Sequence, residues 1–209
     1  MTHDVIGDDQ DRPRAHRRDA AATREAILRS AVSAFTRCGY DGAGLREIAG
    51  AAGVTAMMVN RYFGTKEQLF AEVVDIAFAP RTILVEDGPG LAHGAATELV
   101  ARTAPEAEHL DPFLLMLRSA PNPRAAEIIR AGIERHVGGR VAAQLSGAAA
   151  GERSELLLSL IAGIWLMRKV IGTPALAAAE PGALTAEIEE LFRLLTGEIR
   201  GEPMNRAVR

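Results

Sequence analysis

Apolar residues recur at steps of three and four along most of this chain, and no stretch alternates convincingly at a period of two. The clearest repeat lies near the C-terminal end and consists of Leu184, Ile188, Leu191, Leu195 and Ile199. This spacing places the side chains on one face of an α-helix. The chain also contains 38 alanines among its 209 residues, and alanine favours helices over strands. The sequence therefore predicts an all-α protein of about nine helices.

Capping residues and helix breakers predict where the helices begin and end. The first helix is expected to begin near Thr23, a possible N-cap, and to end at Gly39, since helices often end in a left-handed glycine. Thr65 and Gln68 have the spacing of a capping box, so another helix is expected from there to just before Pro80. Later helices are predicted over 91–104, 112–119, 123–145, 152–172 and 182–200.

Charge is distributed unevenly along the chain. Residues 12–66 carry ten Arg and Lys against four Asp and Glu, whereas the whole chain has a formal net charge of −3. The N-terminal part is therefore basic and the remainder acidic. Because the helices also become longer after residue 80, we expect a flexible tail over 1–19, a small domain over 20–80 and a larger domain over 81–209.

Several classes of protein are disfavoured by what the sequence lacks. Its one cysteine, Cys38, is expected to be a small buried residue, and it excludes an internal disulfide and a cysteine-based zinc site. The longest apolar run, residues 156–167, is too short to span a bilayer, and no secretory signal is visible, so we expect a cytoplasmic protein. No catalytic signature is visible, and the acidic run over 106–111 is typical of a solvated loop. We expect no enzyme activity, no cofactor and no metal.

The segment Leu45 to Phe63 has the spacing of two short helices joined by a tight turn. Ala49 is small where the helices cross, Gly53 suits the positive φ of the turn, and Val59 is the apolar residue that fixes the crossing. In a DNA-binding helix-turn-helix, the second helix enters the major groove by its N-terminal part. Because Val59 and Phe63 face inward, the residues left on its exposed side are Thr55, Ala56, Met57, Asn60 and Arg61.

Residues 23–74 resemble the N-terminal domain of the TetR family of bacterial transcriptional repressors. The resemblance is carried by Gly39-Tyr40, by the turn from Ile48 to Thr55, by the aromatic pair Tyr62-Phe63 and by Thr65-Lys66-Glu67. The helix-turn-helix would then span 44–63, and the rest of the chain shares the helix count and order of the family. The resemblance implies a dimeric, ligand-responsive repressor that binds a palindromic operator in double-stranded DNA.

The sequence departs from the family pattern at positions that face the groove. Gly44 stands where Ser or Thr is common, Asn60 stands where Tyr is common, and Ala56-Met57-Met58 replaces the commoner Lys-Gly or Pro. These departures affect the operator sequence rather than the fold. Ala56 and Met57 can contact a thymine methyl, while Met58 is expected to be half-buried. Asn60 can bind adenine or the DNA backbone, and Arg61 can bind guanine, a phosphate or a surface carboxylate.

Other residues are candidates for contacts with DNA phosphates. The resemblance implies such a contact for Lys66, at the start of a helix, against the alternative of a solvated lysine. Tyr62 can donate its hydroxyl to a phosphate while its ring packs on the domain, and Arg46 is a further candidate. Four arginines of the predicted tail either follow a groove of DNA or remain solvated; they are Arg12, Arg14, Arg17 and Arg18.

The resemblance assigns dimerisation and ligand binding to the domain over 81–209. The last two long helices are expected to pair with those of a second subunit, because they carry more apolar surface than one subunit needs, at Leu160, Ile164, Leu191 and Leu195. The preceding helices are expected to enclose a pocket for an apolar inducer, and the candidate lining residues are Phe78, Phe113, Met116, His136 and Trp165.

Two other functions compete with this interpretation. An all-helical enzyme or carrier that binds a small molecule would make the helix-turn-helix a coincidence. A sequence-indifferent DNA binder would retain the helix-turn-helix, but the acidic larger domain disfavours it, since such proteins gain from uniform positive charge.

Overall fold

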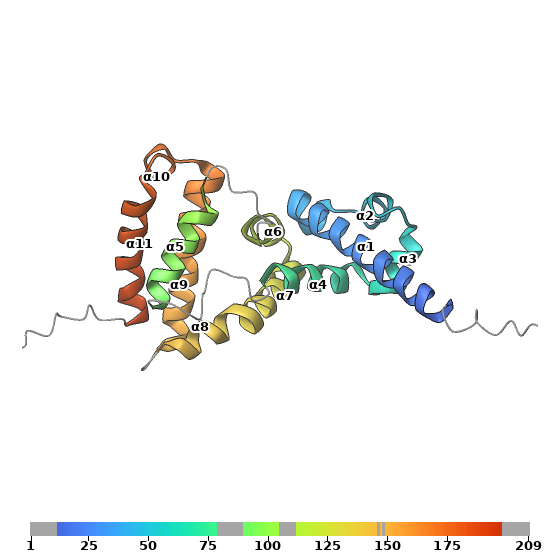
Figure 1. Cartoon of the computed structure of the whole chain (residues 1–209), viewed down its shortest axis with the longest axis horizontal. Helices are drawn as coiled ribbons and strands as arrows, with labels where there is room; N and C mark the ends of the chain where they lie inside the picture. Colours follow the sequence, from blue (N-terminus) through green and yellow to red (C-terminus); the bar gives the residue numbers. More distant parts are fainter. Residues whose placement is uncertain (1–11, 79–89, 105–111, 146, 148, 198–209) are drawn as a thin grey trace, which may run out of the picture. The chain divides into compact units, whose positions relative to one another are not determined.

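The computed structural model describes residues 12–78, 90–104, 112–145, 147 and 149–197 (Figure 1). Within these ranges the chain forms helices and no strands, which confirms the all-α prediction. In chain order the elements are α1 (Arg12–Gly42), α2 (Leu45–Ala51), α3 (Ala56–Phe63), α4 (Lys66–Phe78), α5 (Leu91–Arg102), α6 (Pro112–Ser119), α7 (Pro123–Ile133), the π-helical η1 (Glu134–Gly138), α8 (Gly139–Gln144), α9 (Ala150–Trp165), the π-helical η2 (Leu166–Ile171), α10 (Pro174–Ala177) and α11 (Pro181–Thr196).

Contacts divide the chain into two compact units. The first contains residues 1–77 and 114–130, and therefore α1 to α4 with most of α6 and α7. The second contains residues 78–113 and 131–209, and therefore α5 and the elements from η1 to α11. Residues 114–130 thus group with the N-terminal unit, although they lie in the range predicted for the larger domain.

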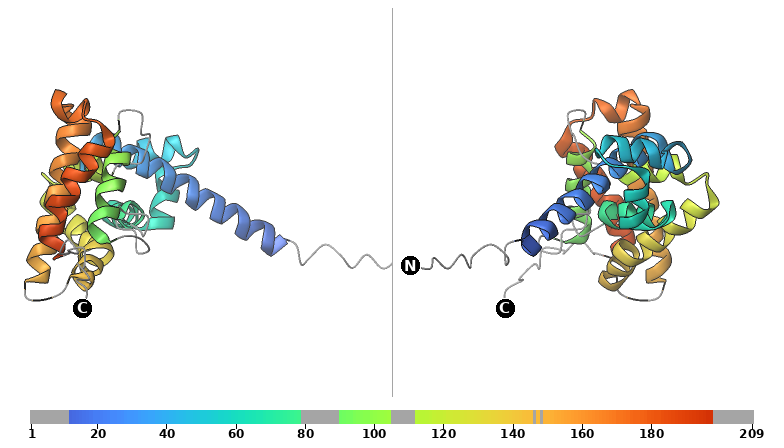
Figure 2. Two further views of the ribbon diagram at one scale, coloured as in Figure 1. Left: turned by 60° about the vertical axis from the view of Figure 1, so that its left-hand side comes forward. Right: turned by 90° about the vertical axis from the view of Figure 1, so that its right-hand side faces the viewer.

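The prediction that the first helix begins near Thr23 is wrong, because α1 begins at Arg12. Residues 12–19, predicted as part of a flexible tail, are therefore helical, while residues 1–11 lie outside the described part of the chain. Thr23 lies inside the helix, where its Oγ1 donates to the carbonyl of Asp19 at 2.8 Å. Pro13 is tolerated because it lies in the first turn. Figure 2 shows the first turns of α1 extending beyond the other helices of this unit.

The C-terminal end of α1 bends at Gly39 and does not stop there. Gly39 has φ 70° and ψ −179°, so the predicted positive φ is confirmed, but helical residues continue to Gly42. The row of buried residues along α1 also ends before this bend. Cys38 continues the spacing of Ile27, Ala31 and Phe35, which are buried, yet it is exposed, so the prediction of a buried cysteine is wrong.

Residues 118–122, which we call the α6–α7 corner, bind the bend of α1 within the first unit. Arg118 donates from Nη1 to the carbonyls of Thr36 and Arg37, at 2.7 and 2.9 Å. The backbone N–H of Tyr40 donates to Ser119 Oγ at 3.0 Å. Asn122 Nδ2 also donates to Asp41 Oδ1 at 2.8 Å. The end of α1 is therefore held by hydrogen bonds from a segment about 80 residues away in the sequence.

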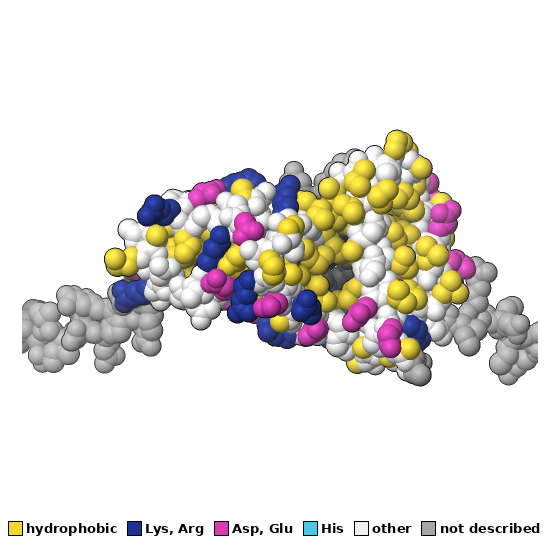
Figure 3. Space-filling model, turned by 180° about the vertical axis from the view of Figure 1, so that it is seen from behind, with side chains coloured by type: hydrophobic (Ala, Val, Ile, Leu, Met, Phe, Trp, Pro, Cys, Tyr) yellow, Lys and Arg dark blue, Asp and Glu magenta, His cyan; other side chains and the backbone are white. Residues whose placement is uncertain are grey.

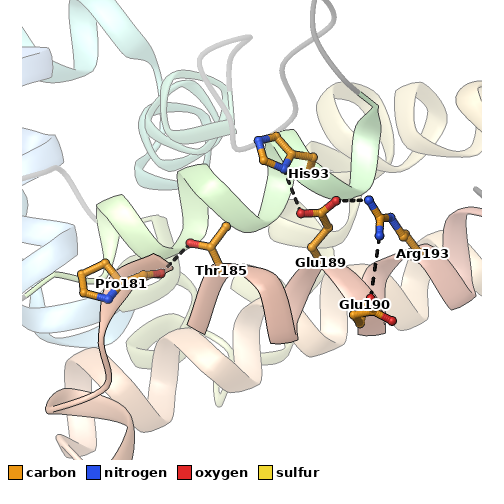
Figure 4. Close-up of polar contacts among 6 residues, drawn as sticks. All are labelled: His93, Pro181, Thr185, Glu189, Glu190 and Arg193. Atoms are coloured by element: carbon orange, nitrogen blue, oxygen red, sulfur yellow. Dashed lines mark hydrogen bonds and ion pairs between the residues drawn. The ribbon is translucent and has the colours of Figure 1, made fainter. Parts of the chain in front are cut away.

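In the second unit, α5 packs against α11. The buried face of α5 is built largely of small residues, and its buried residues are Leu91, Ala92, Ala95, Ala96, Leu99 and Val100. A polar network joins the two helices at the edge of this packing (Figure 4). His93 Nδ1 lies 2.8 Å from Glu189 Oε2, Glu189 also pairs with Arg193, and Arg193 lies 3.8 Å from Glu190.

Two cations of η2 bind the C-terminal end of α5. Arg168 Nη1 donates to the carbonyl of Val100 and to Thr103 Oγ1, each at 2.7 Å, and Lys169 Nζ donates to the carbonyl of Ala104 at 2.7 Å. Positive charge at the C-terminal end of a helix interacts favourably with the helix dipole, and the N–H donors satisfy carbonyls that have no partner within the helix. Burial lowers the pKa of Arg168.

The long predicted helices over 123–145 and 152–172 are present, but each contains a π-helical segment. Pro174, which follows the second of these helices, is the first residue of the short helix α10. None of the helices among the described residues combines the length and the apolar content needed to cross a lipid bilayer.

Candidate nucleic-acid interface

The turn between α2 and α3 has the predicted geometry. Gly53 has φ 70°, and the N–H of Val54 donates to the carbonyl of Ala49 at 2.9 Å, which closes the turn onto α2. Ala49 and Val59 are buried as predicted, at 2% and 1% exposure. The small side chain and the apolar one therefore hold α3 against α2.

Side-chain caps fix the start of α3 and the start of α4. Thr55 Oγ1 accepts from the N–H of Met58 at 3.4 Å and caps α3. At the start of α4, the N–H of Thr65 donates to Gln68 Oε1 at 2.8 Å, and the N–H of Gln68 donates to Thr65 Oγ1 at 3.2 Å. The predicted capping box is confirmed. It places Lys66 as the first residue of α4, with two residues between it and the end of α3.

Of the five residues expected on the exposed side of α3, four are exposed and Ala56 is half-buried. Met57 is 81% exposed, and Asn60 and Arg61 are also exposed. Val59 and Phe63 are buried, while Ala56, Met58 and Tyr62 are half-buried. The helix therefore presents one methionine, one amide and one guanidinium to solvent, and it carries no carboxylate.

The cations of α1 and those close to α3 differ in their partners. Arg24, Arg29 and Arg37 on α1 form ion pairs with Glu72, Glu25 and Glu47, respectively. Arg46 on α2, Arg61 on α3 and Lys66 on α4 have no carboxylate within ion-pair distance among the described residues. These three cations lie before, within and after α3 in the sequence. Their positive charge remains available to an anion.

Lys66 instead contacts an aromatic ring. Its Nζ lies 4.7 Å from the ring centroid of Tyr40, within the range of a cation–π contact. A second contact of this kind places the Arg24 guanidinium 4.7 Å from the ring of Phe63. Sequence reasoning gave Tyr40 no role beyond the family pattern, and its spacing of 26 residues from Lys66 offers no local signal of the contact.

Of the predicted pocket residues, the structure brings two into contact. Phe113 and Trp165 stack in the second unit, with ring centroids 5.1 Å apart and an interplanar angle of 24°. Phe78 is buried and His136, in η1, is half-buried, both in the second unit. Met116 is half-buried on α6 and belongs to the first unit. The acidic run over 106–111 lies outside the described residues.

The predicted dimer residues lie on two helices that pack together, α9 and α11. Leu160 and Leu191 are exposed, and Ile164 and Leu195 are half-buried. Figure 3 shows apolar side chains gathered on one face of the second unit. Exposed apolar residues of α9, η2 and α11 that were not predicted are Leu156, Met167, Val170, Ile171 and Leu194.

Two family models match consecutive parts of the chain. The model of bacterial regulatory proteins of the tetR family matches residues 27–73, and the model of the tetracyclin repressor-like C-terminal domain matches residues 90–195. The chain belongs to the TetR family. The first match ends within α4, and the second runs from the residue before α5 into α11.

Curated transcriptional regulators match about a third of the chain. The HTH-type transcriptional regulator RutR of Escherichia coli K12 is 35% identical over 79 residues, which is 36% of this chain and 37% of RutR. The HTH-type transcriptional repressor NicS of Pseudomonas putida is 37% identical over 60 residues, 29% of this chain and 28% of NicS. This chain therefore spans little more than a third of the curated relatives it matches.

A solved structure shares the fold over most of the chain. The multidrug binding protein EbrR, crystallised with proflavin, aligns with a TM-score of 0.56 at 18% identity and covers 83% of this chain and 99% of EbrR. At this identity the likeness concerns the fold.

Proposed function

We propose that this TetR-family protein is a transcriptional repressor that binds a palindromic operator as a dimer and is released by a small molecule. The observation that carries the DNA-binding part is the arrangement around α3. An exposed helix face without carboxylates is accompanied by three cations, Arg46, Arg61 and Lys66, that have no ion-pair partner among the described residues. Four other arginines of the unit, Arg24, Arg29, Arg37 and Arg124, are paired with carboxylates.

The contacts proposed for α3 follow from exposure and chemistry. Met57 and Ala56 meet thymine methyl groups, Asn60 binds adenine, and Arg61 binds guanine or a phosphate. Lys66, Arg46, Tyr62 and the free hydrogen of the Thr55 hydroxyl contact phosphates. Because Thr55 Oγ1 already accepts from Met58 N, its hydroxyl is oriented as a donor.

The first test is a fluorescence-anisotropy titration with duplexes tiling the DNA that flanks the coding region, in excess competitor DNA at physiological salt. We expect one duplex to bind at nanomolar affinity with two or more subunits per site. Arg61→Ala should weaken that complex by about 1–3 kcal/mol per half-site and relax specificity at one base pair. Arg29→Ala removes the same charge from a paired position and is the matched control.

Uniform binding to all duplexes in the absence of competitor DNA, lost when competitor or salt is added, would instead identify a sequence-indifferent DNA binder. Failure of every duplex to bind would contradict a DNA-binding role and favour a small-molecule-binding protein. Repeating the titration without competitor DNA separates these two outcomes, because the competitor removes the binding that does not depend on sequence.

We propose that the apolar face of α9 and α11 forms the dimer interface. Leu191 is 47% and Leu194 is 79% exposed on α11, and exposed apolar patches of this kind mark association surfaces. Leu191→Glu or Leu194→Glu should halve the mass measured by light scattering at micromolar concentration. Leu117→Glu on α6 is the control, because Leu117 is also 47% exposed but lies in the first unit. A wild-type mass near 22.3 kDa would refute the interface.

We propose that the small molecule that releases the repressor from its operator is apolar or aromatic and binds in the second unit. The stacked pair Phe113 and Trp165 supports this, since it offers a half-buried ring beside a buried one. The proflavin complex of EbrR supports an aromatic ligand by analogy of fold. Proflavin should quench Trp165 fluorescence and, with a coupling of about 1–3 kcal/mol, weaken operator binding about 5–150-fold. Phe113→Ala should abolish both effects, and unchanged operator affinity at saturating quench would contradict the ligand's role in release.

A further inference from the structure

The ring of Tyr40 lies directly beside the ammonium group of Lys66, 4.7 Å from centroid to Nζ. We propose that Tyr40 is a positioning residue that holds Lys66 in place for a contact with an operator phosphate. This inference rests on the proposed DNA-binding function. The residue that would position Lys66 therefore lies in the bend of α1, outside the helix-turn-helix.

Tyr40 is fixed from three directions. It is 7% exposed, its ring stacks with Phe35 at 6.2 Å, and it meets the edge of Phe70 at 5.0 Å. Its backbone N–H donates to Ser119 Oγ in the α6–α7 corner. A ring held in this way presents its face in one orientation, as a positioning role requires.

The hydroxyl of Tyr40 binds the carboxylate next to Lys66 in the sequence. Glu67 accepts from its own backbone N–H, from Thr65 and from Tyr40, and these bonds lower its pKa. Burial, together with the hydrogen bond to Glu67, raises the pKa of Tyr40 to about 12. Glu67 is therefore ionised at neutral pH, but its oxygens are engaged by three donors at the start of α4. No described carboxylate lies within ion-pair distance of Lys66.

The consequence is an ammonium group that is oriented without being neutralised. A cation–π contact attracts the charge through the ring face and does not occupy the three N–H donors with an acceptor oxygen. A carboxylate partner would compete with the phosphate for those donors. The ring removes part of the conformational freedom that a long lysine side chain loses on binding. A contact of this strength corresponds to about two- to fivefold in affinity per subunit.

A double-mutant cycle tests the proposal on the operator found by the titration. Tyr40→Leu should weaken binding of the dimer about 5–25-fold, and Lys66→Met should weaken it and lower the salt slope by about one per subunit. In the Lys66→Met background, Tyr40→Leu should add no further loss. Tyr40→Phe keeps the ring and should retain most of the affinity. Equal losses in both backgrounds would show that Tyr40 acts only through packing, and would overturn the proposal.

A second measurement covers the case in which Tyr40→Leu fails to fold. Phenylalanine with increasing numbers of fluorine atoms, incorporated at position 40, weakens the negative ring face while keeping its shape. Operator affinity should fall in steps with fluorination, with no such fall in the Lys66→Met background. A flat series would overturn the positioning role.

The free protein offers an independent readout, because Lys66 and Lys169 are its only lysines. Lysine labelled with carbon-13 should give two sets of side-chain signals, of which that of Lys66 is shifted upfield by the ring. The shift should persist in Tyr40→Phe and disappear in Tyr40→Leu. If the shift is present but no duplex is bound, the proposed function fails. If duplex is bound specifically and the cycle is additive, only the role of Tyr40 fails.

Discussion

Gly39 is the residue whose replacement the structure penalises most clearly. Its φ of 70° with ψ of −179° is a backbone region that is essentially restricted to glycine, and another residue there costs about 1–3 kcal/mol. A Cβ at this position would also lie 2.3 Å from the carbonyl oxygen of Arg118. Relief of that overlap requires the end of α6 to retreat by about 1 Å, to reach ordinary contact distance.

This retreat strains the hydrogen bonds of the α6–α7 corner. Arg118 donates to two carbonyls of α1, and Ser119 accepts from Tyr40, at distances between 2.7 and 3.0 Å. Loss of each contributes about 0.5–1.5 kcal/mol, more where the acceptor is left buried. Together with the backbone term, Gly39→Ala should destabilise the first unit by about 3–6 kcal/mol.

Two other glycines separate the cost of the backbone conformation from the cost of the overlap with Arg118. Gly53 has the same φ of 70° with no atom near its Cβ position, so Gly53→Ala should cost only the backbone term, about 1–2 kcal/mol. Gly50 is exposed in α2 with open space and without a positive φ, so Gly50→Ala should stabilise by about 0.5–1 kcal/mol.

The assay is thermal unfolding followed by near-ultraviolet circular dichroism of tyrosine. Both tyrosines, Tyr40 and Tyr62, belong to the first unit, while the one tryptophan, Trp165, belongs to the second and is followed separately by fluorescence. Gly39→Ala should lower the tyrosine-monitored midpoint by roughly 12 °C or more, since 1 kcal/mol shifts a domain of this size by about 4–8 °C. If Gly39→Ala is no worse than Gly53→Ala, the contact with Arg118 does not constrain the bend, and the reasoning is refuted.

Three further predictions concern single side chains. Replacing the thymines of the operator with deoxyuridine should weaken wild-type binding about fourfold for each methyl group contacted, and should leave Met57→Ala unaffected; equal losses in both proteins would show that Met57 reads no methyl group. Thr65→Ala removes one bond of the capping box and should destabilise the first unit by about 1 kcal/mol in the same tyrosine-monitored assay, and an unchanged midpoint would contradict the role of the cap. Glu180 accepts from the N–H groups of Gly182 and Ala183, which lower its pKa, so the stabilisation of the start of α11 should be present above the ordinary pKa of glutamate and be lost as pH falls through the lowered value. Amide-exchange protection of Gly182 and Ala183 should show this loss in wild type and be absent throughout in Glu180→Ala; protection that is independent of pH would contradict it.

The parts of the fold that the sequence predicted correctly depend on contacts between neighbouring residues. The positive φ of Gly53 and the box of Thr65 with Gln68 each involve residues no more than a few positions apart. Because local spacing determines these contacts, a single sequence is sufficient to predict them. Most of the exposed side of α3 is predicted in the same way, because Val59 and Phe63 belong to the core and the residues between them face outward.

The errors have equally specific causes. Thr23 has the side chain of a helix cap and so predicts a start that is too late, whereas a threonine inside a helix can bond to the carbonyl four residues earlier, as it does here to Asp19. Cys38 is exposed although it continues the apolar periodicity of α1, because the row of buried residues ends at the bend. The π-helical segments have no signature in the apolar spacing, since neighbouring turns still satisfy the period of the α-helix.

The contact between Tyr40 and Lys66 differs from these cases because it depends on two sets of distant contacts at once. The bend at Gly39 turns Tyr40 into the core, and Ser119 then fixes its backbone from 79 residues away. The same six-residue stretch, 36–41, binds the α6–α7 corner through Arg118, Ser119 and Asn122 and supports Lys66 through its ring. Any change that shifts the end of α6 must therefore either break these hydrogen bonds or move the ring beside Lys66. Through this geometry, a displacement of α6 within the first unit reaches the start of α4.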